Sequence, residues 1–149
     1  MKPVIDESDL HHRYKKEIVH TMESEPYAQF LGIRLTEIGE GTAVAELDIE
    51  DHMLNSHGTV HGAITFAIAD YVFAAASNSY GKTSVGISTT VNYMAAGEKG
   101  TRLKATATEE KKNHRMAWYK VKVESDNELI ATMEAVAYRK SHYFVPLEE

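Results

Sequence analysis

The 149-residue chain contains no cysteine. It therefore has no disulfide, no thiolate nucleophile, and no zinc or iron–sulfur site built on cysteine. Basic residues are also scarce relative to acidic ones, since 16 Lys and Arg face 22 Asp and Glu and give a formal net charge of −6. This surplus of acid argues against a general nucleic-acid binder.

The sequence also lacks an apolar run suited to crossing a membrane. The only candidate, residues 61–76, is short for a bilayer and carries Asp70 near its middle, so a buried core helix is the better interpretation. No apolar segment follows the charges of residues 1–7, which argues against a signal peptide. We therefore expect a cytoplasmic protein whose partners include neither nucleic acid nor a membrane.

The remaining composition suits one folded domain. A hydrophobic content of 43% is ordinary for a globular protein, and 149 residues are enough to bury a real core. The chain contains no linker, low-complexity tract or internal repeat. We predict a single domain over residues 1–149, with a helical N-terminal extension over 1–25 and a C-terminal tail over 141–149.

The N-terminal extension shows helical periodicity. Apolar residues recur there at every fourth position: Leu10, Tyr14, Ile18 and Met22. This stripe predicts one helix that begins after Ser8 or Asp9 and runs to about Ser24. A second, short helix over 27–31 is predicted to end at Gly32.

The rest of the chain predicts one long helix among strands. The helix runs from about Gly62 to Ser79, with Gly81 as its C-cap. Five or six strands are predicted from these segments: 33–38, 42–49, 84–93, 102–112, 116–125 and 129–139. Because the helix is apolar nearly all round, we predict an α+β fold in which a curved antiparallel sheet wraps around it.

Asp70 is the most informative residue because it lies within that apolar helix. An ionised carboxylate in apolar surroundings costs several kcal/mol, roughly, unless a specific partner compensates it. The structural explanation is a hydroxyl, such as that of Ser77, or an arginine that satisfies the carboxylate. The functional explanation is a general base or a nucleophile directed at an acyl carbon.

The start of the same helix predicts a second functional group. Backbone N–H groups of a first helical turn lack intrahelical partners, and Gly62 has no side chain to block a carbonyl that approaches them. His61 either orients this turn or polarises the carbonyl, while Asn55 either supports the loop or binds substrate. A tight loop-to-helix junction is the plain alternative, because glycine and asparagine are common there.

The spacing of these two groups requires a second subunit. Gly62 and Asp70 are separated by eight positions, which is about 12 Å along a helix and about 80° around it. They therefore cannot contact one carbonyl within a single chain. A two-fold homodimer would place Asp70 of one chain beside Gly62 of the other and create two interfacial active sites.

Two further segments carry candidate binding residues. One hydroxyl among Ser88, Thr89 and Thr90 is expected to hold a water near Asp70, while the others merely suit a strand. A basic stretch is a candidate for the phosphates of a large thiol carrier, or else a solvated turn. It comprises Lys111, Lys112, Asn113, His114 and Arg115.

Metal chemistry is weakly indicated. His57 and His61 have the spacing of a metal-binding pair on a helix, but Gly58 and the polar loop around it argue against a helix there. We therefore predict no metal site.

Together these residues resemble a known family. Residues 55–63, Asn-Ser-His-Gly-Thr-Val-His-Gly-Ala, followed by Asp70, are similar to the motif of the phenylacetate-degradation (PaaI-like) branch of the hotdog-fold acyl-CoA thioesterases. The similarity extends over about residues 30–139. Ala63 stands where many members have a second glycine; this leaves the helix start intact but bears on the space for the acyl group.

The resemblance implies a hotdog fold and homodimers that commonly pair into tetramers. It implies hydrolysis of acyl-CoA, with aromatic or medium-chain acyl groups, to free acid and CoA. No metal or separate cofactor is implied, because coenzyme A is part of the substrate.

The resemblance also implies a role for each site residue. Gly62 would supply the oxyanion N–H, and Asp70 of the neighbouring subunit would be the base or nucleophile. His61 and Asn55 would polarise or position the thioester. Ser88, or Thr89, would help to place the water.

Two alternatives use the same scaffold. A non-catalytic acyl-CoA sensor would bind the thioester without cleaving it, since a fold does not determine a function. A dehydratase acting on hydroxyacyl thioesters would also use a histidine and a carboxylate, although the spacing of His61 and Asp70 fits hydrolysis better.

Overall fold

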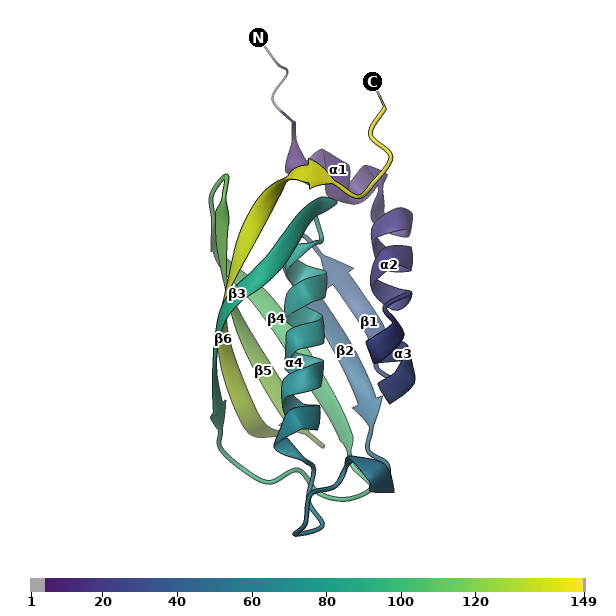
Figure 1. Ribbon diagram of the computed structural model, residues 1–149, viewed down its shortest axis with the longest axis vertical. Coiled ribbons are helices and arrows are strands. Elements are labelled where there is room, and N and C mark those ends of the chain that lie inside the picture. Colours follow the sequence, from purple (N-terminus) through teal and green to yellow (C-terminus); the bar gives the residue numbers. More distant parts are fainter. Residues whose placement is uncertain (1–4, 149) are drawn as a thin grey trace.

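A computed structural model describes residues 5–148 of the chain. Its main layer is a six-stranded sheet with the strand order β1-β2-β4-β5-β6-β3. All neighbouring strands run antiparallel. The strands are β1 (Arg34–Gly39), β2 (Thr42–Asp48), β3 (Lys82–Tyr93), β4 (Arg102–Lys112), β5 (Met116–Ser125) and β6 (Glu128–Tyr143). Figure 1 shows this sheet curving around one long helix, α4 (Gly62–Ser77).

The core lies between α4 and the concave face of the sheet. Ile68 and Val72 on α4 are completely buried, as are Leu47 and Leu103 on β2 and β4, with exposed fractions of 0–1%. Full burial of one such side chain contributes about 1.5–3 kcal/mol relative to exposure, so this contact is a major source of stability. The predicted α+β fold, an antiparallel sheet around one central helix, is therefore confirmed.

The sheet does not enclose α4 completely. Ala63 and Asp70 are exposed, and Phe66 and Ala74 are half-buried. These four residues are spaced at three or four positions, so they form one stripe along the helix. Ala63, Phe66, Asp70 and Ala74 constitute the open stripe of α4.

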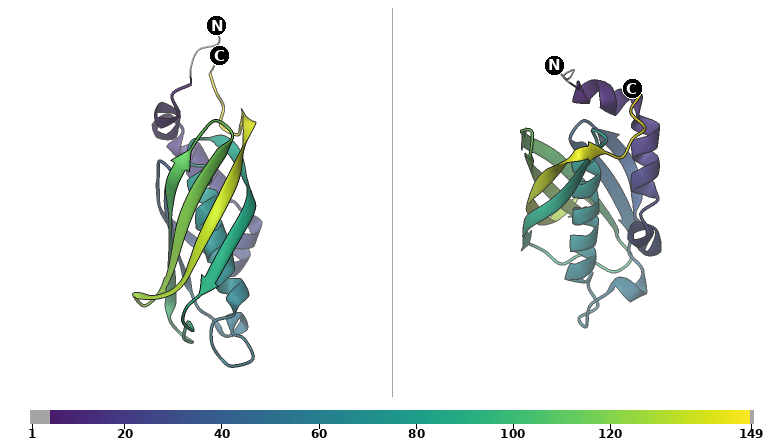
Figure 2. Two further views of the ribbon diagram at one scale, coloured as in Figure 1. Left: turned by 90° about the vertical axis from the view of Figure 1, so that its left-hand side faces the viewer. Right: turned by 45° about the horizontal axis from the view of Figure 1, so that its top comes forward.

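The part of the chain before the sheet contains three helices, not the two predicted: α1 (Glu7–Arg13), α2 (Lys15–Glu23) and α3 (Pro26–Leu31). The predicted continuous helix breaks at Tyr14, whose φ of −109° and ψ of 21° are not helical. The side chain of Asp6, rather than Ser8 or Asp9, caps α1. Figure 2 shows that the break turns α1 across the end of the sheet, while α2 runs along its side.

The other helix ends follow local chemistry. Gly32 ends α3 as predicted, with a φ of +86° that glycine adopts without strain. By contrast, α4 ends at Ser77 and not at Ser79, because Asn78 is its C-cap. The side-chain amide nitrogen of Asn78 donates to the carbonyls of Ala74 (2.8 Å) and Ser84 (3.2 Å), which ties the helix end to β3. Gly81 lies in the turn that follows.

The C-terminal part of the chain differs from the predicted tail over 141–149. The last strand, β6, continues to Tyr143, so the first three residues of the predicted tail are part of the sheet. Within residues 5–148, every helix is too short or too polar to cross a bilayer. The predictions made on residues 1–4 and on the final residue lie outside the described residues.

Candidate functional site

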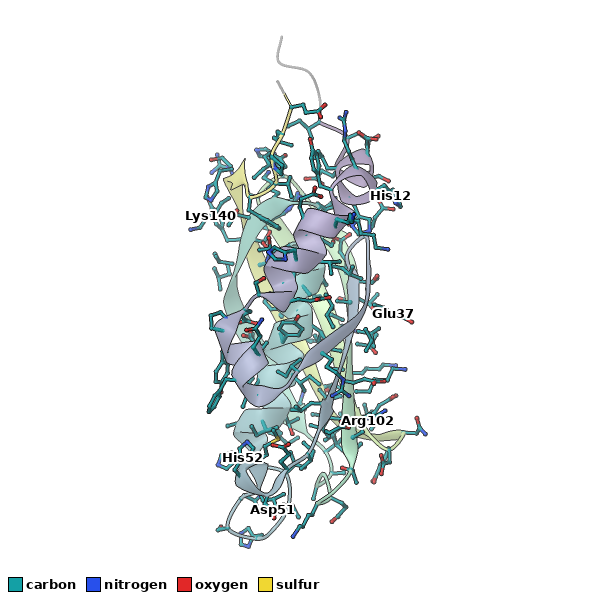
Figure 3. All side chains as sticks on the ribbon, turned by 90° about the vertical axis from the view of Figure 1, so that its right-hand side faces the viewer. His12, Glu37, Asp51, His52, Arg102 and Lys140 are labelled. Carbon is teal, nitrogen blue, oxygen red and sulfur yellow. The ribbon has the colours of Figure 1, made fainter. Side chains whose placement is uncertain are left out.

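The loop before α4 is shaped by Asn55. Its side-chain oxygen accepts hydrogen bonds from the backbone N–H groups of His57 (2.9 Å) and Thr59 (3.2 Å), and its amide nitrogen donates to the hydroxyl of Thr59 (2.9 Å). These contacts favour the structural role for Asn55, that of holding the loop. Figure 3 shows Asp51 and His52, at the start of this loop, at one end of the molecule.

His61 connects the loop to α4. It occupies the N-cap position, and its Nδ1 atom accepts the backbone N–H of Ala63 at 2.9 Å. Since Nδ1 acts as acceptor, the proton of the neutral ring lies on Nε2. The side chain therefore orients the helix start, and its exposed Nε2–H is left as a donor for an approaching carbonyl.

Gly62 is the first residue of α4 and offers a backbone donor. Its N–H donates to no acceptor within residues 5–148. Its carbonyl accepts the hydroxyl of Tyr93 (3.3 Å), at the end of β3. The free N–H lies at the positive end of the helix dipole, which favours a developing negative charge. Tyr93 was not predicted, because nothing in its strand pattern distinguishes it.

Asp70 lies halfway along the open stripe of α4. In the single chain its side chain is exposed to solvent, although its neighbours in sequence are apolar. Within residues 5–148 no side chain forms a hydrogen bond or ion pair with it. The hydroxyl of Ser77 donates instead to the carbonyl of Ala74, at 3.2 Å. The structural explanation for Asp70 therefore gains no support.

A pocket of about 250 Å³ opens beside Asp70. Its walls include Tyr27 and Ile33 from the N-terminal part of the chain, and Phe66 and Tyr71 from α4. These walls withdraw Asp70 in part from water, and this burial raises the pKa of its carboxyl. The arrangement offers a carboxylate of increased basicity next to an apolar cavity.

A second carboxylate, that of Glu25, also lines this pocket. Burial, together with the negative charge of Asp70, raises the pKa of Glu25. Burial and the charges of Glu25 and Glu23 raise the pKa of Tyr71 to about 12. Glu25 was not predicted, because it stands far from Asp70 in sequence and belongs to no motif.

The register of β3 distinguishes the two candidate hydroxyls. Thr89 pairs with Ala135, which is buried, whereas Ser88 pairs with Val136, which is not. Side chains directly opposite each other in a sheet point to the same face. Thr89 therefore shares the face that α4 covers, and Ser88 the outer face. The predicted role of Ser88 in placing water fits this register less well than the same role for Thr89.

Residues of the predicted phosphate-binding stretch form contacts that stabilise the fold. The ammonium of Lys112 pairs with the carboxylate of Glu7 and lies 3.6 Å from the ring centre of Tyr80. The side-chain oxygen of Asn113 accepts the N–H groups of Arg115 (3.0 Å) and Met116 (2.8 Å), which forms the turn. These contacts favour the alternative of a structural turn.

His114 and Arg115 are exposed at the tip of the same turn. The carbonyl of His114 accepts a hydrogen bond from Lys82, which follows the C-terminal end of α4. The turn therefore lies at the opposite end of α4 from Gly62, and a helix of 16 residues is about 24 Å long. Within one chain, the structure does not bring Lys112, Asn113, His114 or Arg115 to Gly62.

No cluster of three or more histidine or acidic side chains suited to a metal ion occurs in the part of the chain that the structure describes. His57 is exposed in the loop, and His61 is committed to the N–H of Ala63. The two histidines of the predicted metal alternative therefore have separate roles.

Known proteins share this sequence pattern. The profile of the Thioesterase superfamily matches residues 57–132. An inferred esterase from Archaeoglobus fulgidus is 37% identical over 119 residues, which are 79% of this chain and 77% of that protein. The acyl-coenzyme A thioesterase PaaI of Escherichia coli is 38% identical over 89 residues, which are 59% of this chain and 64% of that protein.

Solved structures share the fold. The structure of the E. coli PaaI protein from the phenylacetic acid degradation operon superimposes with a TM-score of 0.83 and 26% sequence identity. The match covers 93% of this chain and 99% of that one, so the N-terminal helices of this chain fall largely within it.

Proposed function

The chain belongs to the thioesterase superfamily and is a PaaI-like thioester hydrolase of the hotdog fold; from this premise we propose that it cleaves acyl-CoA to free acid and coenzyme A. The acyl-CoA thioesterase among its relatives supports this substrate class. We extend the proposal to aromatic and medium-chain acyl groups, because the pocket beside Asp70 is small and has apolar and aromatic walls.

The proposal rests on two groups of α4 that are free to contact a substrate. Asp70 and the N–H of Gly62 both lack a hydrogen-bond partner within residues 5–148. A base and an oxyanion donor that are left free are what hydrolysis of a thioester needs. Neither is explained by the stability of the fold.

The proposed reaction begins with the thioester carbonyl directed at the N–H of Gly62. Asp70 either takes a proton from water as the water oxygen bonds to the carbonyl carbon, or bonds to that carbon itself and is released by water afterwards. The Gly62 N–H stabilises the oxyanion, a contribution of about 3 kcal/mol for one such donor. The oxyanion then collapses and the carbon–sulfur bond breaks; on the covalent path this step precedes the attack of water. The thiolate of coenzyme A takes the proton that Asp70 removed from water, or a proton from solvent on the covalent path.

His61 and Thr89 assist in this proposal. The Nε2–H of His61 is the second donor toward the carbonyl, because Nδ1 is occupied by the N–H of Ala63. The hydroxyl of Thr89 holds the attacking water, since Thr89 lies on the face of the sheet toward α4. Asn55 acts indirectly, by holding the loop that positions His61.

We propose that the active sites form between two subunits. In the order of the sheet, β3 is an edge strand, and it carries the exposed apolar side chain of Ile87, 57% of which is accessible. An exposed apolar edge is a template for pairing with a second copy of the same strand. Such a dimer would place Asp70 beside the partner's Gly62, and pairing of two dimers remains a prediction.

The test is a panel of acyl-CoA thioesters incubated with the purified protein, with release of thiol as the readout. We expect turnover of at least one aromatic or medium-chain member, and its loss in Asp70→Asn. Binding without hydrolysis over hours would identify a sensor instead. Formation of an unsaturated product from a hydroxyacyl-CoA would identify a dehydratase.

A further inference from the structure

The side chain of Glu25 does not stabilise α3, the helix that it precedes. It stands directly before Pro26, at the N-cap of α3, yet its side chain makes no capping hydrogen bond. Only its backbone carbonyl contributes, by accepting the N–H of Gln29 at 3.1 Å. The carboxyl group is free to face the pocket beside Asp70, which it lines.

The charges around this pocket have one sign. Glu25 contributes from the position before α3 and Asp70 from α4, and among the described residues no lysine, arginine or histidine lines the pocket. Glu23, at the end of α2, adds its negative field at Tyr71. The raised pKa values of Glu25 and Asp70 agree with two carboxyls that share a partly dehydrated space.

The remaining walls are apolar or aromatic. Tyr27, Ile33 and Phe66 surround the space next to the two carboxyls. A pocket of about 250 Å³ holds a ring or a short chain, but not the long polar arm of coenzyme A. Given that Asp70 must reach the carbonyl carbon, the part of the substrate that enters this pocket is the acyl group.

We propose that Glu25 is a specificity-determining residue that selects against acyl groups ending in a carboxylate. This inference rests on the proposed hydrolysis of acyl-CoA. A neutral ring or chain enters the apolar walls, whereas an anionic end meets the like charges of Glu25 and Asp70. With an effective dielectric constant of about 20, repulsion by one charge a few ångströms away lowers reactivity by about tenfold or more.

The experiment compares acyl-CoA pairs of equal length with and without a terminal carboxylate: butanoyl with succinyl, and hexanoyl with adipoyl. The readout is the ratio of kcat/KM within each pair, for the wild type and for three variants. Glu25→Gln removes the charge and Glu25→Lys reverses it. Glu23→Gln is the matched control, because Glu23 is a neighbouring acid that does not line the pocket.

We expect the wild type to favour the neutral member of each pair. Glu25→Gln should lower that preference by about tenfold, and Glu25→Lys should lower it further. Glu23→Gln should leave the ratio within about twofold of the wild type, since Glu23 does not line the pocket and solvent between it and the acyl group screens its charge. The helix should tolerate all three changes, because Glu25 and Glu23 are both exposed.

Three outcomes would overturn the role of Glu25 and leave the proposed function intact. They are equal turnover of both members of a pair by the wild type, an unchanged kcat/KM ratio in Glu25→Gln, and an equal change of that ratio in Glu23→Gln. If the wild type cleaves no acyl-CoA, the proposed function fails separately. Calorimetric affinities for the same pairs would then decide the role of Glu25, and equal affinities in the wild type and Glu25→Gln would refute it.

Discussion

Gly62 and Asp70 lie on one uninterrupted helix, α4, at its first and ninth residues. The rise of a helix places them about 12 Å apart along its axis, so one chain cannot bring both to a single carbonyl. Both nevertheless remain free of hydrogen-bond partners within residues 5–148. This separation is the reason that the proposed mechanism requires two subunits.

Replacing Asp70 should abolish turnover without disturbing the fold. We expect Asp70→Asn and Asp70→Ala to lower kcat by about 10²–10⁴-fold, the usual effect of losing a general base. Because Asp70 is exposed and unpaired in the chain, the free energy of unfolding should change by less than about 1 kcal/mol. Thiol release and thermal unfolding measure the two quantities, and full turnover by both variants would rule out the catalytic role.

The reaction should lose activity at acidic pH. Burial raises the pKa of Asp70, and only the ionised carboxylate acts as base or nucleophile. As the pH falls through this raised pKa, kcat/KM should therefore fall, and it should do so above the ordinary value of about 3.9 for an aspartate. A pH–rate profile with circular dichroism at each pH checks this. An intact fold with constant kcat/KM down to pH 4 would contradict it.

The register of β3 predicts unequal effects of two neighbouring hydroxyls. Thr89→Val should lower kcat by at least about tenfold if Thr89 holds the water, as a lost hydrogen bond to a reacting group does. Ser88→Ala should change kcat by less than about twofold, because Ser88 lies on the outer face. Steady-state kinetics of the two variants decide between them, and the reverse order would restore the role first predicted for Ser88.

The fold follows from local patterns that the sequence displays. Period-two alternation marks the strands, and the apolar run after Gly62 marks the helix that they surround. A break in the backbone within a continuous side-chain pattern is less predictable. Tyr14 belongs to a continuous apolar stripe, and the burial of Leu10 and Ile18 confirms that stripe, yet the backbone bends at Tyr14.

The sequence predicts only those parts of the site whose residues are close together in the chain. The positions of His61, Gly62 and Asp70 relative to α4 follow from their spacing on one helix. The contact of Lys112 with Glu7 joins residues that are 105 positions apart, so the basic stretch looked free in the sequence. For the same reason, neither the proximity of Glu25 to Asp70 nor the contact of Tyr93 with Gly62 has a sequence signal.

Glu7 should be important for stability at the end of the sheet. It pairs with Lys112 and with Arg139, whose side chain is only 3% exposed. Glu7→Gln would leave Arg139 buried without its counter-charge, so we expect the free energy of unfolding to fall by about 3 kcal/mol. Chemical denaturation measures it. The control is Arg13→Gln, which breaks an exposed pair with Glu148 and should cost less than about 1 kcal/mol.

The contribution of Glu7 should also depend on pH. Burial alone would raise its pKa, but the hydrogen bonds and charges of Lys112 and Arg139 lower it overall. A lowered pKa in the folded state means that the stabilisation is present at neutral pH and is lost as the pH falls through that lowered value. Equal stability of the wild type and Glu7→Gln at neutral pH would contradict this account.

The edge strand β3 should control both assembly and activity. Ile87→Lys places a charge on each copy of the proposed interface, and we expect it to convert dimers to monomers and to reduce kcat in parallel. Leu147→Lys, a similar change in the exposed C-terminal segment, is the control. Analytical ultracentrifugation and thiol release provide the readouts, and a fully active monomer would refute an interfacial site.

The most direct measurement mixes two inactive variants. Asp70→Asn lacks the carboxylate, and Gly62→Pro lacks the N–H. Proline should be tolerated at Gly62, because it is the first residue of α4 and the preceding His61 has the extended backbone that proline requires. A mixed dimer then contains one site with both mutations and one site with neither.

Random assembly of equal amounts makes half of the dimers mixed, each with one intact site, so we expect about one quarter of wild-type activity. Each variant alone should be nearly inactive. If the mixture is as inactive as its components while native mass spectrometry shows that mixed dimers have formed, Asp70 and Gly62 do not act across the interface.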